Sequence, residues 1–434
     1  MQSVFHGSRS CSQEFLLYKS DSREDEQKSS ETLVVSEEFQ KRFPDKSSGK
    51  LLIESAMTVL DSSLTFAVML IRSPMFFLEA AKIADDFCRQ ERAVWGIAEQ
   101  HLLACFFPDK SVESAFKLAH KLIGKLPLNQ NINIGIAGYP QANFSRDRII
   151  ENARKALEHA AISGPGKIAV FDAISLNISG DKFYQEGHIH KAIEEFKTAL
   201  LLDPSNVNIH NSLGVCYGAL GAHKSALEEF ETAIQIAPNE VMAHYNAGLV
   251  TLLMADTEKA LIHFSNAAQT GEDVFEVYFQ LGKLHLKSEK PENAKEFLGK
   301  ATVIKPDSVS AWRYLGECCT ALNLTEEAIK AYKKAVKLNP SDAESLSALG
   351  ELFILQGENP DIAIAFCQHS IEITQDNGLF RHRLGLAYFK QNRLEEALKE
   401  FQKAIECGYD SSEFIEKISD IRDYESIKYP ITRK

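Results

Sequence analysis

The stretch VNIHNSLGVCYGALGAHKSALEEFETAIQIAPNE, residues 207–240, carries the pattern that decides the fold of more than half of this chain. Its Gly214 belongs to a series in which each glycine follows the last by 34 residues, and the final one by 35. The series is Gly180, Gly214, Gly248, Gly282, Gly316, Gly350 and Gly385. A helical unit of this period cannot bury its apolar face alone, so neighbouring units are expected to stack into a solenoid.

Small and bulky residues recur at fixed places when each glycine is counted as the eighth residue of its unit. Position 20 is Ala192, Ala226, Ala260, Ala294 and Ala328; position 24 is Phe196, Phe230, Phe264, Leu298 and Tyr332; position 27 is Ala199, Ala233, Ala267, Ala301 and Ala335. Position 32 is proline in four units, where it ends a helix that it cannot continue. This pattern resembles the tetratricopeptide repeat (TPR). The resemblance implies an all-α solenoid of seven helix pairs over 173–411, with a capping helix and tail in 412–434.

Three repeats depart from the pattern, the first of them by Ser179 where a bulky residue is usual. The third has Thr270-Gly271-Glu272-Asp273 in place of its proline, and the sixth has one extra residue near Glu358-Asn359-Pro360. The insertion moves Ala363 and Ser370 into the small-residue positions. We expect local irregularities at these places and no missing repeat.

Composition and charge narrow the classes of partner. The chain has 434 residues, a formal net charge of −12 and a pI near 5.6, which argues against a nucleic-acid partner. No apolar run is long enough to span a membrane, and the N-terminus lacks the layout of a secretory signal. Eight cysteines without Cys-x-x-Cys spacing fit reduced thiols. These features predict a cytoplasmic protein, which we take to be bacterial.

The part before the repeats divides in two. Residues 1–48 are rich in Ser, Glu, Lys and Asp and are expected to be a mobile polar segment. Residues 50–172 are expected to form a compact α/β domain. Its predicted strands are 64–71, 101–107, 132–137 and 167–171, and its predicted helices are 75–90, 112–126 and 146–161.

Several strings in this α/β domain resemble the GGDEF domain of diguanylate cyclases. Asn133-Ile134-Gly135-Ile136-Ala137 is similar to that family's Ser-Ile-Gly-Val-Ala strand. Residues 149–157 look like its Leu-Leu-x-x-Ala-Asp-x-Ala-Leu helix, and 164–167 fall where the family has Gly-Arg-Asn. The resemblance implies a nucleotide cyclase-like fold.

The catalytic parts that this resemblance implies are missing. The signature hairpin falls on 99–103, which has neither Gly-Gly nor an acidic pair, and the metal-binding Asp falls near 72–74. The expected Lys and Arg are replaced by Ala161 and Pro165, and 88–93 contains no product-inhibition motif. We therefore expect a degenerate domain, not an enzyme, without cofactor or metal, that serves docking or homodimerisation. The alternative is a signalling protein that still binds GTP or cyclic di-GMP; residual cyclase activity is a weaker alternative.

Isolated reactive residues are given structural interpretations. The acids Asp85, Asp86 and Glu91 are expected on a solvated helix face, and His101 is expected to be structural. The Cys318-Cys319 pair is expected to pack in the core.

The repeats supply the candidate binding site. In the resembled family the first helices line a concave groove, mainly through positions 2, 5, 9, 12 and 13. The predicted groove residues are Met242, Tyr245, Leu249, Leu252, Phe279, Lys283, Leu286, Lys287 and Arg313. They predict a protein partner, bound as an amphipathic helix or an extended peptide. The alternative is that some of them only pack between neighbouring units.

One known mode of binding is excluded by the sequence. Chaperone-tail binders of the resembled family carry Lys at position 5 and Asn at position 9, which clamp a terminal carboxylate. Here the corresponding pairs are Asn177/Asp181, Asn211/Val215, Tyr245/Leu249 and Phe279/Lys283. The carboxylate clamp is therefore absent.

Overall fold

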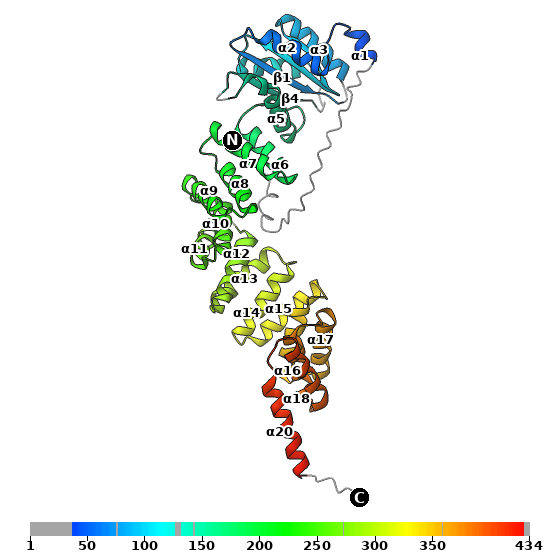
Figure 1. Ribbon diagram of the computed structural model, residues 1–434, viewed down its shortest axis with the longest axis vertical. Coiled ribbons are helices and arrows are strands. Elements are labelled where there is room, and N and C mark those ends of the chain that lie inside the picture. The colour runs from blue at the N-terminus through cyan, green and yellow to red at the C-terminus, as the bar shows by residue number, and fades with distance from the viewer. Residues whose placement is uncertain are drawn as a thin grey trace. The chain divides into compact units, whose positions relative to one another are not determined.

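The computed structural model describes residues 37–74, 77–125, 132–141, 144–271, 273–357 and 359–428. It divides into two compact units, Met1–Met254 and Ala255–Lys434. In Figure 1 the first unit runs from blue to green, and the second from yellow-green to red. Among the described residues, no helix has the combination of length and apolar character that crossing a membrane requires.

The first unit begins with a five-stranded sheet in the order β2-β3-β1-β4-β5. The strands are β1 Phe66–Arg72, β2 Val94–Glu99, β3 Leu102–Pro108, β4 Asn133–Tyr139 and β5 Ile168–Val170. Strand β1 is antiparallel to both neighbours, β3 and β4, whereas β4 and β5 are parallel. The chain order of the first four strands is β-α-β-β-α-β, the split βαβ arrangement.

Strand β2 is absent from the expectations drawn from the sequence, which placed strands at 64–71 and 101–107 but none between them. Gly96 interrupts its apolar residues, and glycine in a strand ordinarily weakens it. The structure gives the reason for Gly96. A Cβ added there would lie 2.3 Å from the backbone oxygen of Ser47 and 2.9 Å from Leu52. The segment around Ser47, which leads into the helix Gly49–Leu60, passes so close to Gly96 that a side chain would not fit there.

Helices cover both faces of the sheet. One face is covered by α2 (Gly49–Leu60), which the sequence did not predict, and by α5 (Ile149–Ile162). The other is covered by α3 (Phe77–Gln90) and α4 (Val112–Ile123). The β strands are therefore buried on both sides, which explains their continuous apolar sequences.

Part of the segment expected to be mobile is helical. Residues 1–36 lie outside the described residues, but α1 (Glu37–Arg42) precedes the α/β core. Its Phe39 is 2% exposed and its ring lies 6.2 Å from Trp95 and 6.0 Å from Phe77. Three aromatic rings thus hold α1 against the face covered by α3.

The first repeat packs on the α/β core within the first unit. It consists of α6 (Ala173–Gln185) and α7 (Ile189–Leu202). One apolar cluster continues from Leu157 on α5 to Leu176 and Phe196 on these helices. Lys155, also on α5 and 8% exposed, donates to Glu195 of α7 at 2.7 Å. Apolar burial and a shielded ion pair therefore join the sheet domain to the repeat array.

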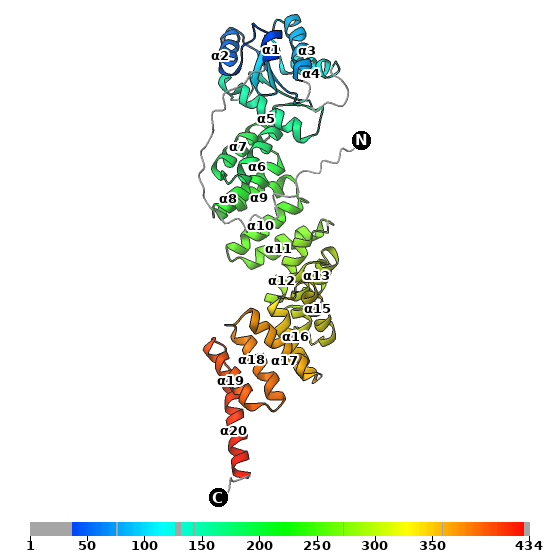
Figure 2. The ribbon, with the colours of Figure 1, turned by 90° about the vertical axis from the view of Figure 1, so that its right-hand side faces the viewer.

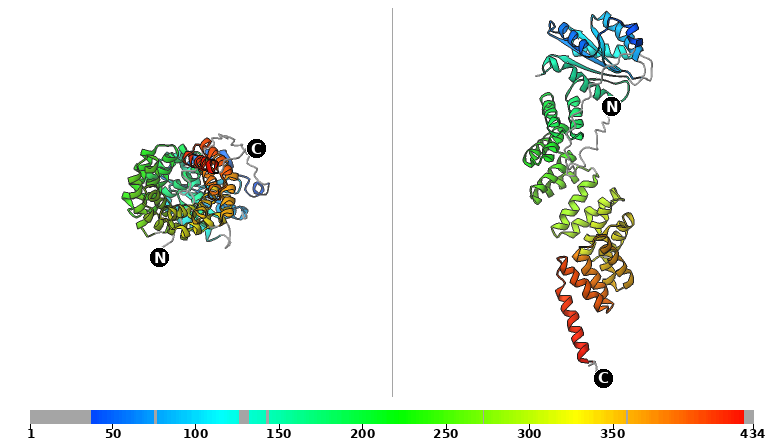
Figure 3. Two further views of the ribbon diagram at one scale, coloured as in Figure 1. Left: turned by 90° about the horizontal axis from the view of Figure 1, so that it is seen from below. Right: turned by 45° about the vertical axis from the view of Figure 1, so that its right-hand side comes forward.

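Seven helix pairs and a terminal helix follow the sheet, as the 34-residue period predicts (Figures 2 and 3). After α6 and α7 come α8 Val207–Ala219, α9 His223–Ile236, α10 Val241–Leu253, α11 Thr257–Gln269, α12 Phe275–Lys287, α13 Pro291–Ile304, α14 Val309–Ala321, α15 Thr325–Leu338, α16 Ala343–Gln356, α17 Pro360–Ile373, α18 Gly378–Lys390 and α19 Leu394–Glu406. The capping helix is α20, Ser412–Lys428.

The recurring glycines lie where the two helices of a pair approach most closely. A Cβ added to Gly214 would be 2.6 Å from the ring of Phe230, and one added to Gly282 would be 2.5 Å from Cγ of Leu298. In the first, second, fourth, fifth and seventh repeats, the bulky residue at position 24 occupies the space that a side chain at position 8 would need; in the sixth, Sγ of Cys367 lies there. Phe230 and Leu298 are both fully buried.

In the sixth repeat, the extra residue lies in the turn between the two helices, α16 and α17. Gly357 and Asn359 both adopt left-handed backbone conformations, with φ of 70° and 49°. Ala363 and Ser370 are fully buried, which confirms the shifted register. The third unit, which lacks its proline, ends α11 with Gly271 at φ 85°.

Two glycines of the fourth repeat, α12 and α13, give a matched test of this packing. We expect Gly282→Ala to lower the free energy of unfolding by roughly 1–3 kcal/mol, because Leu298 has no room to move. Gly299→Ala, with nothing within 4 Å of the added Cβ, is expected to raise it by about 1 kcal/mol through helix propensity. Urea unfolding followed by circular dichroism measures both. Equal effects of the two substitutions would contradict the close-approach explanation.

Candidate partner-binding site

The groove residues predicted in the first unit lie on α10 and differ in exposure. Tyr245 and Leu249 are each only 5% exposed, whereas Met242 and Leu252 are partly exposed. For Tyr245 and Leu249 the packing alternative therefore fits better than an open groove. Substitutions there would disturb the fold before they tested binding.

The groove residues predicted in the second unit are more accessible. Phe279, Lys283 and Leu286 on α12 are partly exposed, and Lys287 is exposed. Arg313 on α14 is also partly exposed. These five side chains are the part of the predicted site that a partner could reach without unfolding the chain.

Contacts between successive first helices follow a rule that the sequence did not suggest. The side chain at position 6 reaches back to position 5 or 9 of the preceding first helix. We call this series of contacts the position-6 ladder. In the first unit, Asn246 on α10 donates its side-chain amide to Asn211 on α8 at 2.9 Å.

The position-6 ladder continues in the second unit. The ring of Tyr314 on α14 packs edge-on against Phe279 on α12, with centroids 5.6 Å apart. Arg383 on α18 donates to Ser347 at 3.1 Å and pairs with Glu351 at 2.5 Å, both on α16. Position 6 was left out of the predicted groove, although its recurring polar and aromatic residues could have marked it.

One member of the ladder has no side chain long enough to make this contact. Ala348 occupies position 6 of α16, and the residues at positions 5 and 9 of the helix before it are Arg313 and Glu317. Arg313 is instead held from the start of α16, by Glu344 at 3.1 Å and Asp342 at 3.6 Å. Nothing that the structure describes makes an ion pair with Glu317.

Lys283 has an unusual environment for a lysine. Its Nζ lies 5.4 Å from the centroid of the Phe279 ring and 5.6 Å from that of Tyr314. Partial burial lowers the pKa of Lys283, and the neighbouring charge of Arg313 lowers it further. Within the described ranges no carboxylate pairs with this amine. Two aromatic faces stabilise its charge instead.

Glu317 occupies the same position as Lys283, position 9, in the next repeat. The residue as a whole is exposed, yet the surrounding chain still partly desolvates its carboxylate. This desolvation raises the pKa of Glu317, while the charges of Arg313 and Arg383 lower it.

The first unit contains a half-buried carboxyl group at the corresponding position. Asp181 lies at position 9 of α6, and burial raises its pKa to about 6, while a hydrogen bond with Ser212 at position 6 of α8 opposes the shift. This contact belongs to the position-6 ladder. The cost of burying Asp181 falls on its charged form.

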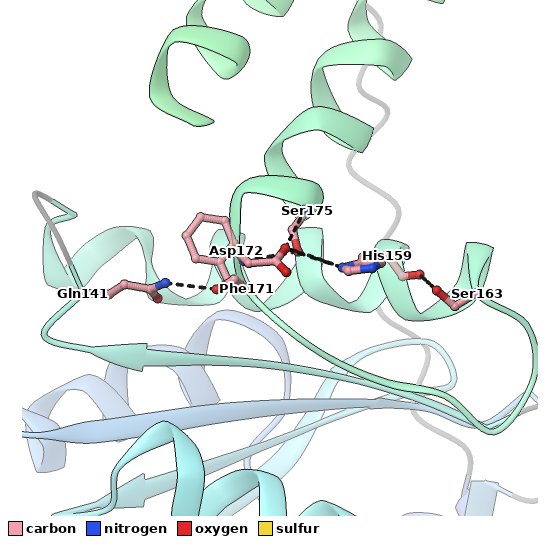
Figure 4. A network of polar contacts seen from close by, with 6 residues as sticks. All are labelled: Gln141, His159, Ser163, Phe171, Asp172 and Ser175. Atoms are coloured by element: carbon pink, nitrogen blue, oxygen red, sulfur yellow. Dashed lines mark hydrogen bonds and ion pairs between the residues drawn. The ribbon is translucent and has the colours of Figure 1, made fainter. Parts of the chain in front are cut away.

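A serine, a histidine and an aspartate meet where the sheet domain joins the first repeat (Figure 4). Nδ1 of His159 lies 3.3 Å from Oγ of Ser175 and 3.6 Å from Oδ1 of Asp172. A catalytic triad places the serine and the acid on opposite ring nitrogens, and here both face the same one. Ser175 is fully buried, donates to Asp172 at 2.9 Å and completes a capping box at the start of α6.

This cluster therefore stabilises the junction and does not form a nucleophilic site. A shallow cavity of about 510 Å³ lies beside it, lined in part by Phe116, Lys167 and Val170. The interactions of Asp172 with His159 and Ser175 outweigh its desolvation and lower its pKa.

The acidic residues of the sheet domain are engaged in structure. The expectation that Asp85 lies on a solvated face is wrong, because the residue is 6% exposed. It accepts a hydrogen bond from Nε1 of Trp95 at 2.8 Å and pairs with Arg89 at 2.8 Å. Glu99, at the predicted signature hairpin, pairs with Arg154. Neither carboxylate is left without a partner.

The cysteines and the remaining metal-ligating residues give no sign of a reactive site. Cys318 and Cys319 are 0% and 1% exposed, which confirms that they pack in the core. Burial raises the pKa of Cys318 to about 12. Across the described ranges, no three His, Cys, Asp or Glu side chains gather in a way that could hold a metal ion.

Comparison with known families identifies the helical repeats. Three family models described as TPR or tetratricopeptide repeat match this chain. The matched residues are 180–221 and 319–357 for one, 207–240 and 275–308 for the second, and 379–408 for the third. The chain contains tetratricopeptide repeats, a class of protein that generally serves as an interaction scaffold. No curated protein matches the chain in sequence.

Several solved structures resemble parts of the chain. YrrB, described as a TPR protein with an unusual peptide-binding site, is 20% identical, covers 43% of this chain and 96% of its own, and has a TM-score of 0.41. Pseudomonas aeruginosa PilF is 20% identical over 48% of this chain and 95% of its own, with a TM-score of 0.43. A TPR protein from Parabacteroides merdae is 19% identical over 57% and 96%, with a TM-score of 0.39.

Asp181 predicts a pH dependence of stability. Its folded pKa of about 6 lies above the ordinary 3.8, so folding loses stability as pH rises from about 4 to about 6, and the loss is constant above that. We expect Asp181→Asn to raise the free energy of unfolding by roughly 2–3 kcal/mol at pH 7.5 and by about 1 kcal/mol at pH 4.5. Urea unfolding at the two pH values measures this difference. Asp86→Asn, at an exposed position, is the control; a gain independent of pH for Asp181→Asn would contradict the interpretation.

Proposed function

We propose that this chain is a non-catalytic scaffold whose tetratricopeptide repeats bind a peptide or helix of a partner protein. The observation that carries the proposal is an accessible surface of the second unit, where Phe279, Lys283 and Tyr314 form an aromatic and cationic patch. The two rings stabilise the charge of Lys283, and no carboxylate of the described residues pairs with it, so its amine can still pair with an acidic side chain of a partner. Leu286, Lys287 and Arg313 extend the same surface.

Within the first unit, taken by itself, the proposed partner-binding surface includes Met242 and Leu252. Both are partly exposed, and both lie at positions that line the groove in the family that the repeats resemble. Tyr245 and Leu249 are retained in the proposal only as packing residues beneath this surface.

The sheet domain is proposed to be a degenerate cyclase-like module that docks another protein or forms a homodimer. Two observations support this. The β-α-β-β-α-β order places the resembling strings on β4, at the start of α5 and before β5. Arg154 forms an ion pair with Glu99, the acid at the start of the predicted signature hairpin. A reducing cytoplasm as the location is supported by the seven cysteines of the described ranges, all of which are free.

Capture of the partner tests the groove. Purified full-length protein, immobilised and exposed to a lysate of the source cells, is expected to retain a partner that the Phe279→Ala, Lys283→Glu double variant retains at least tenfold less. The reason is that the double variant removes the aromatic face and reverses the charge of the patch. Quantitative mass spectrometry of the retained proteins gives the ratio.

The matched control for this capture is Lys330→Glu, which makes the same charge change at an exposed position of the second helix α15. Circular dichroism and thermal unfolding must agree among the three proteins. Equal retention by the double variant and the wild type would remove this surface from consideration.

Calorimetry tests the non-catalytic interpretation of the sheet domain. Titration of the full-length protein with GTP and magnesium, and separately with cyclic di-GMP, is expected to give no binding heat, because the catalytic motifs are missing. Micromolar binding of either nucleotide would replace the scaffold interpretation of this domain with a signalling one.

A further inference from the structure

The two edges of the sheet differ in what covers them. At the β2 edge the chain that leads into α2 lies against the strand, where Ser48 forms a parallel bridge with Ile97. The opposite edge is β5, Ile168–Val170. Among the residues that the structure describes, none forms a backbone hydrogen bond with the outer side of β5. An open strand edge of this kind is a template for pairing with another chain.

The hydrogen bonds of β5 show which of its backbone groups are free for such pairing. The carbonyl group of Lys167 accepts a hydrogen bond from β4 at 3.0 Å, and the N–H of Phe171 donates one to β4 at 2.8 Å. Successive residues of a strand direct their backbone groups to alternate sides. The N–H and C=O groups of Ile168 and Val170 therefore point away from β4.

We propose that β5 pairs in antiparallel fashion with β5 of a second copy of this chain, so that the two sheets join across a two-fold axis at Ala169. The proposal rests on the homodimer proposed above for the sheet domain and adds to it the interface and the register. It does not depend on the partner-binding surface of the repeats.

Strand β5 is complementary to its own copy in this register. With Ala169 opposite Ala169, Ile168 of each copy lies opposite Val170 of the other. Each of these two pairs exchanges two backbone hydrogen bonds, which gives four in total. Ile168 and Val170 are both β-branched and half-buried, and side chains of this kind pack well across strands. A two-fold interface requires a surface that fits itself in this way.

The charges at the two ends of β5 are complementary in the same register. Lys167 precedes the strand and Asp172 follows it, so antiparallel pairing brings Lys167 of each copy beside Asp172 of the other. Lys167 is exposed, and within the described ranges it forms no ion pair. Asp172 contacts His159 and Ser175 through Oδ1 (Figure 4), which leaves Oδ2 for the second copy. Exposed ion pairs add little affinity, but they favour one register over another.

The surroundings of β5 leave room for a second strand. The cavity of about 510 Å³ lies along this edge, because all three residues of β5 line it together with Phe116 of α4. Ile162 at the end of α5 and Ile174 at the start of α6 lie within two residues of its lining. These three apolar side chains are 36%, 71% and 45% exposed. Exposed apolar groups gathered around an open edge are typical of an interface.

Sedimentation velocity of the full-length protein, over a hundredfold range of concentration, tests the proposal. We expect a reversible dimer. Val170→Pro removes the outward N–H of each copy, and with it two of the four hydrogen bonds, while the bonds to β4 keep their donors. Its dissociation constant for the dimer is expected to be at least tenfold higher. Val170→Thr keeps both the N–H and the β-branched shape, so this matched control should dimerise like the wild type.

A second variant tests the contribution of charge. Lys167→Glu is expected to weaken the dimer by roughly tenfold, because the two-fold axis brings two acids together at both ends of the paired strands. Circular dichroism and thermal unfolding check that each variant folds like the wild type.

A cross-link at the two-fold axis tests the register. Residues opposite each other in a non-hydrogen-bonded antiparallel pair have Cα atoms about 4.5 Å apart, which is within the range of a disulfide. Ala169→Cys is therefore expected to form an intermolecular disulfide on oxidation with diamide, seen as a dimer on a non-reducing gel. Lys330→Cys, at an exposed position of α15, is the control. The wild type, treated in parallel, gives the background from the natural cysteines.

Each outcome decides the proposal. A dimer that persists in Val170→Pro, or that does not cross-link through Ala169→Cys, overturns it and leaves the homodimer to another surface. A wild type that stays monomeric at every concentration overturns both the proposal and the homodimer, and leaves docking of another protein as the role of the sheet domain. Loss of the dimer in Val170→Pro together with the cross-link supports both. If Val170→Pro does not fold, the cross-link alone decides.

Discussion

The close approach of the two helices in each repeat is the constraint on which the helical part of this protein depends. A glycine at position 8 of the first helix leaves room for the bulky side chain at position 24 of the second. In the second repeat the ring of Phe230 fills that room completely. Because the glycine recurs at intervals of 34 or 35 residues, most pairs close in the same way and present the same positions to their neighbours. The accessible surface is thus fixed by a packing requirement that has nothing to do with binding.

The contacts of the position-6 ladder place different chemical groups on this regular arrangement of helices. In several repeats the side chain at position 6 reaches back to the preceding first helix, through an amide at Asn246, a ring at Tyr314 and a guanidinium at Arg383. The chemistry differs from unit to unit while the geometry stays constant. At Ala348 the ladder is interrupted, because this residue is 8% exposed and packs in the apolar core of the second unit.

The sheet domain follows a different logic. Its acidic residues make contacts within the domain. Asp85 accepts a hydrogen bond from Trp95 and pairs with Arg89, and Glu99 pairs with Arg154. The Asp172, Ser175 and His159 cluster caps α6 and secures the start of the repeats. With Lys155 and Glu195 across the same boundary, the domain and the first repeat form one packed body within the first unit. This makes it a rigid support for the beginning of the array.

The sequence by itself determined the repeat number, the helix pairing and the small and bulky positions, because a 34-residue period and its glycines report a local steric requirement directly. It also located most strands of the sheet, since each is a continuous apolar run. It missed β2, because the reason for Gly96 is a crossing chain from residues 47–52. Only the tertiary structure decided which groove residues are accessible: Tyr245 and Leu249 are buried, while Lys283 is not. Exposure and ion pairing depend on residues brought together from neighbouring helices, and no single helix carries that information in its own sequence.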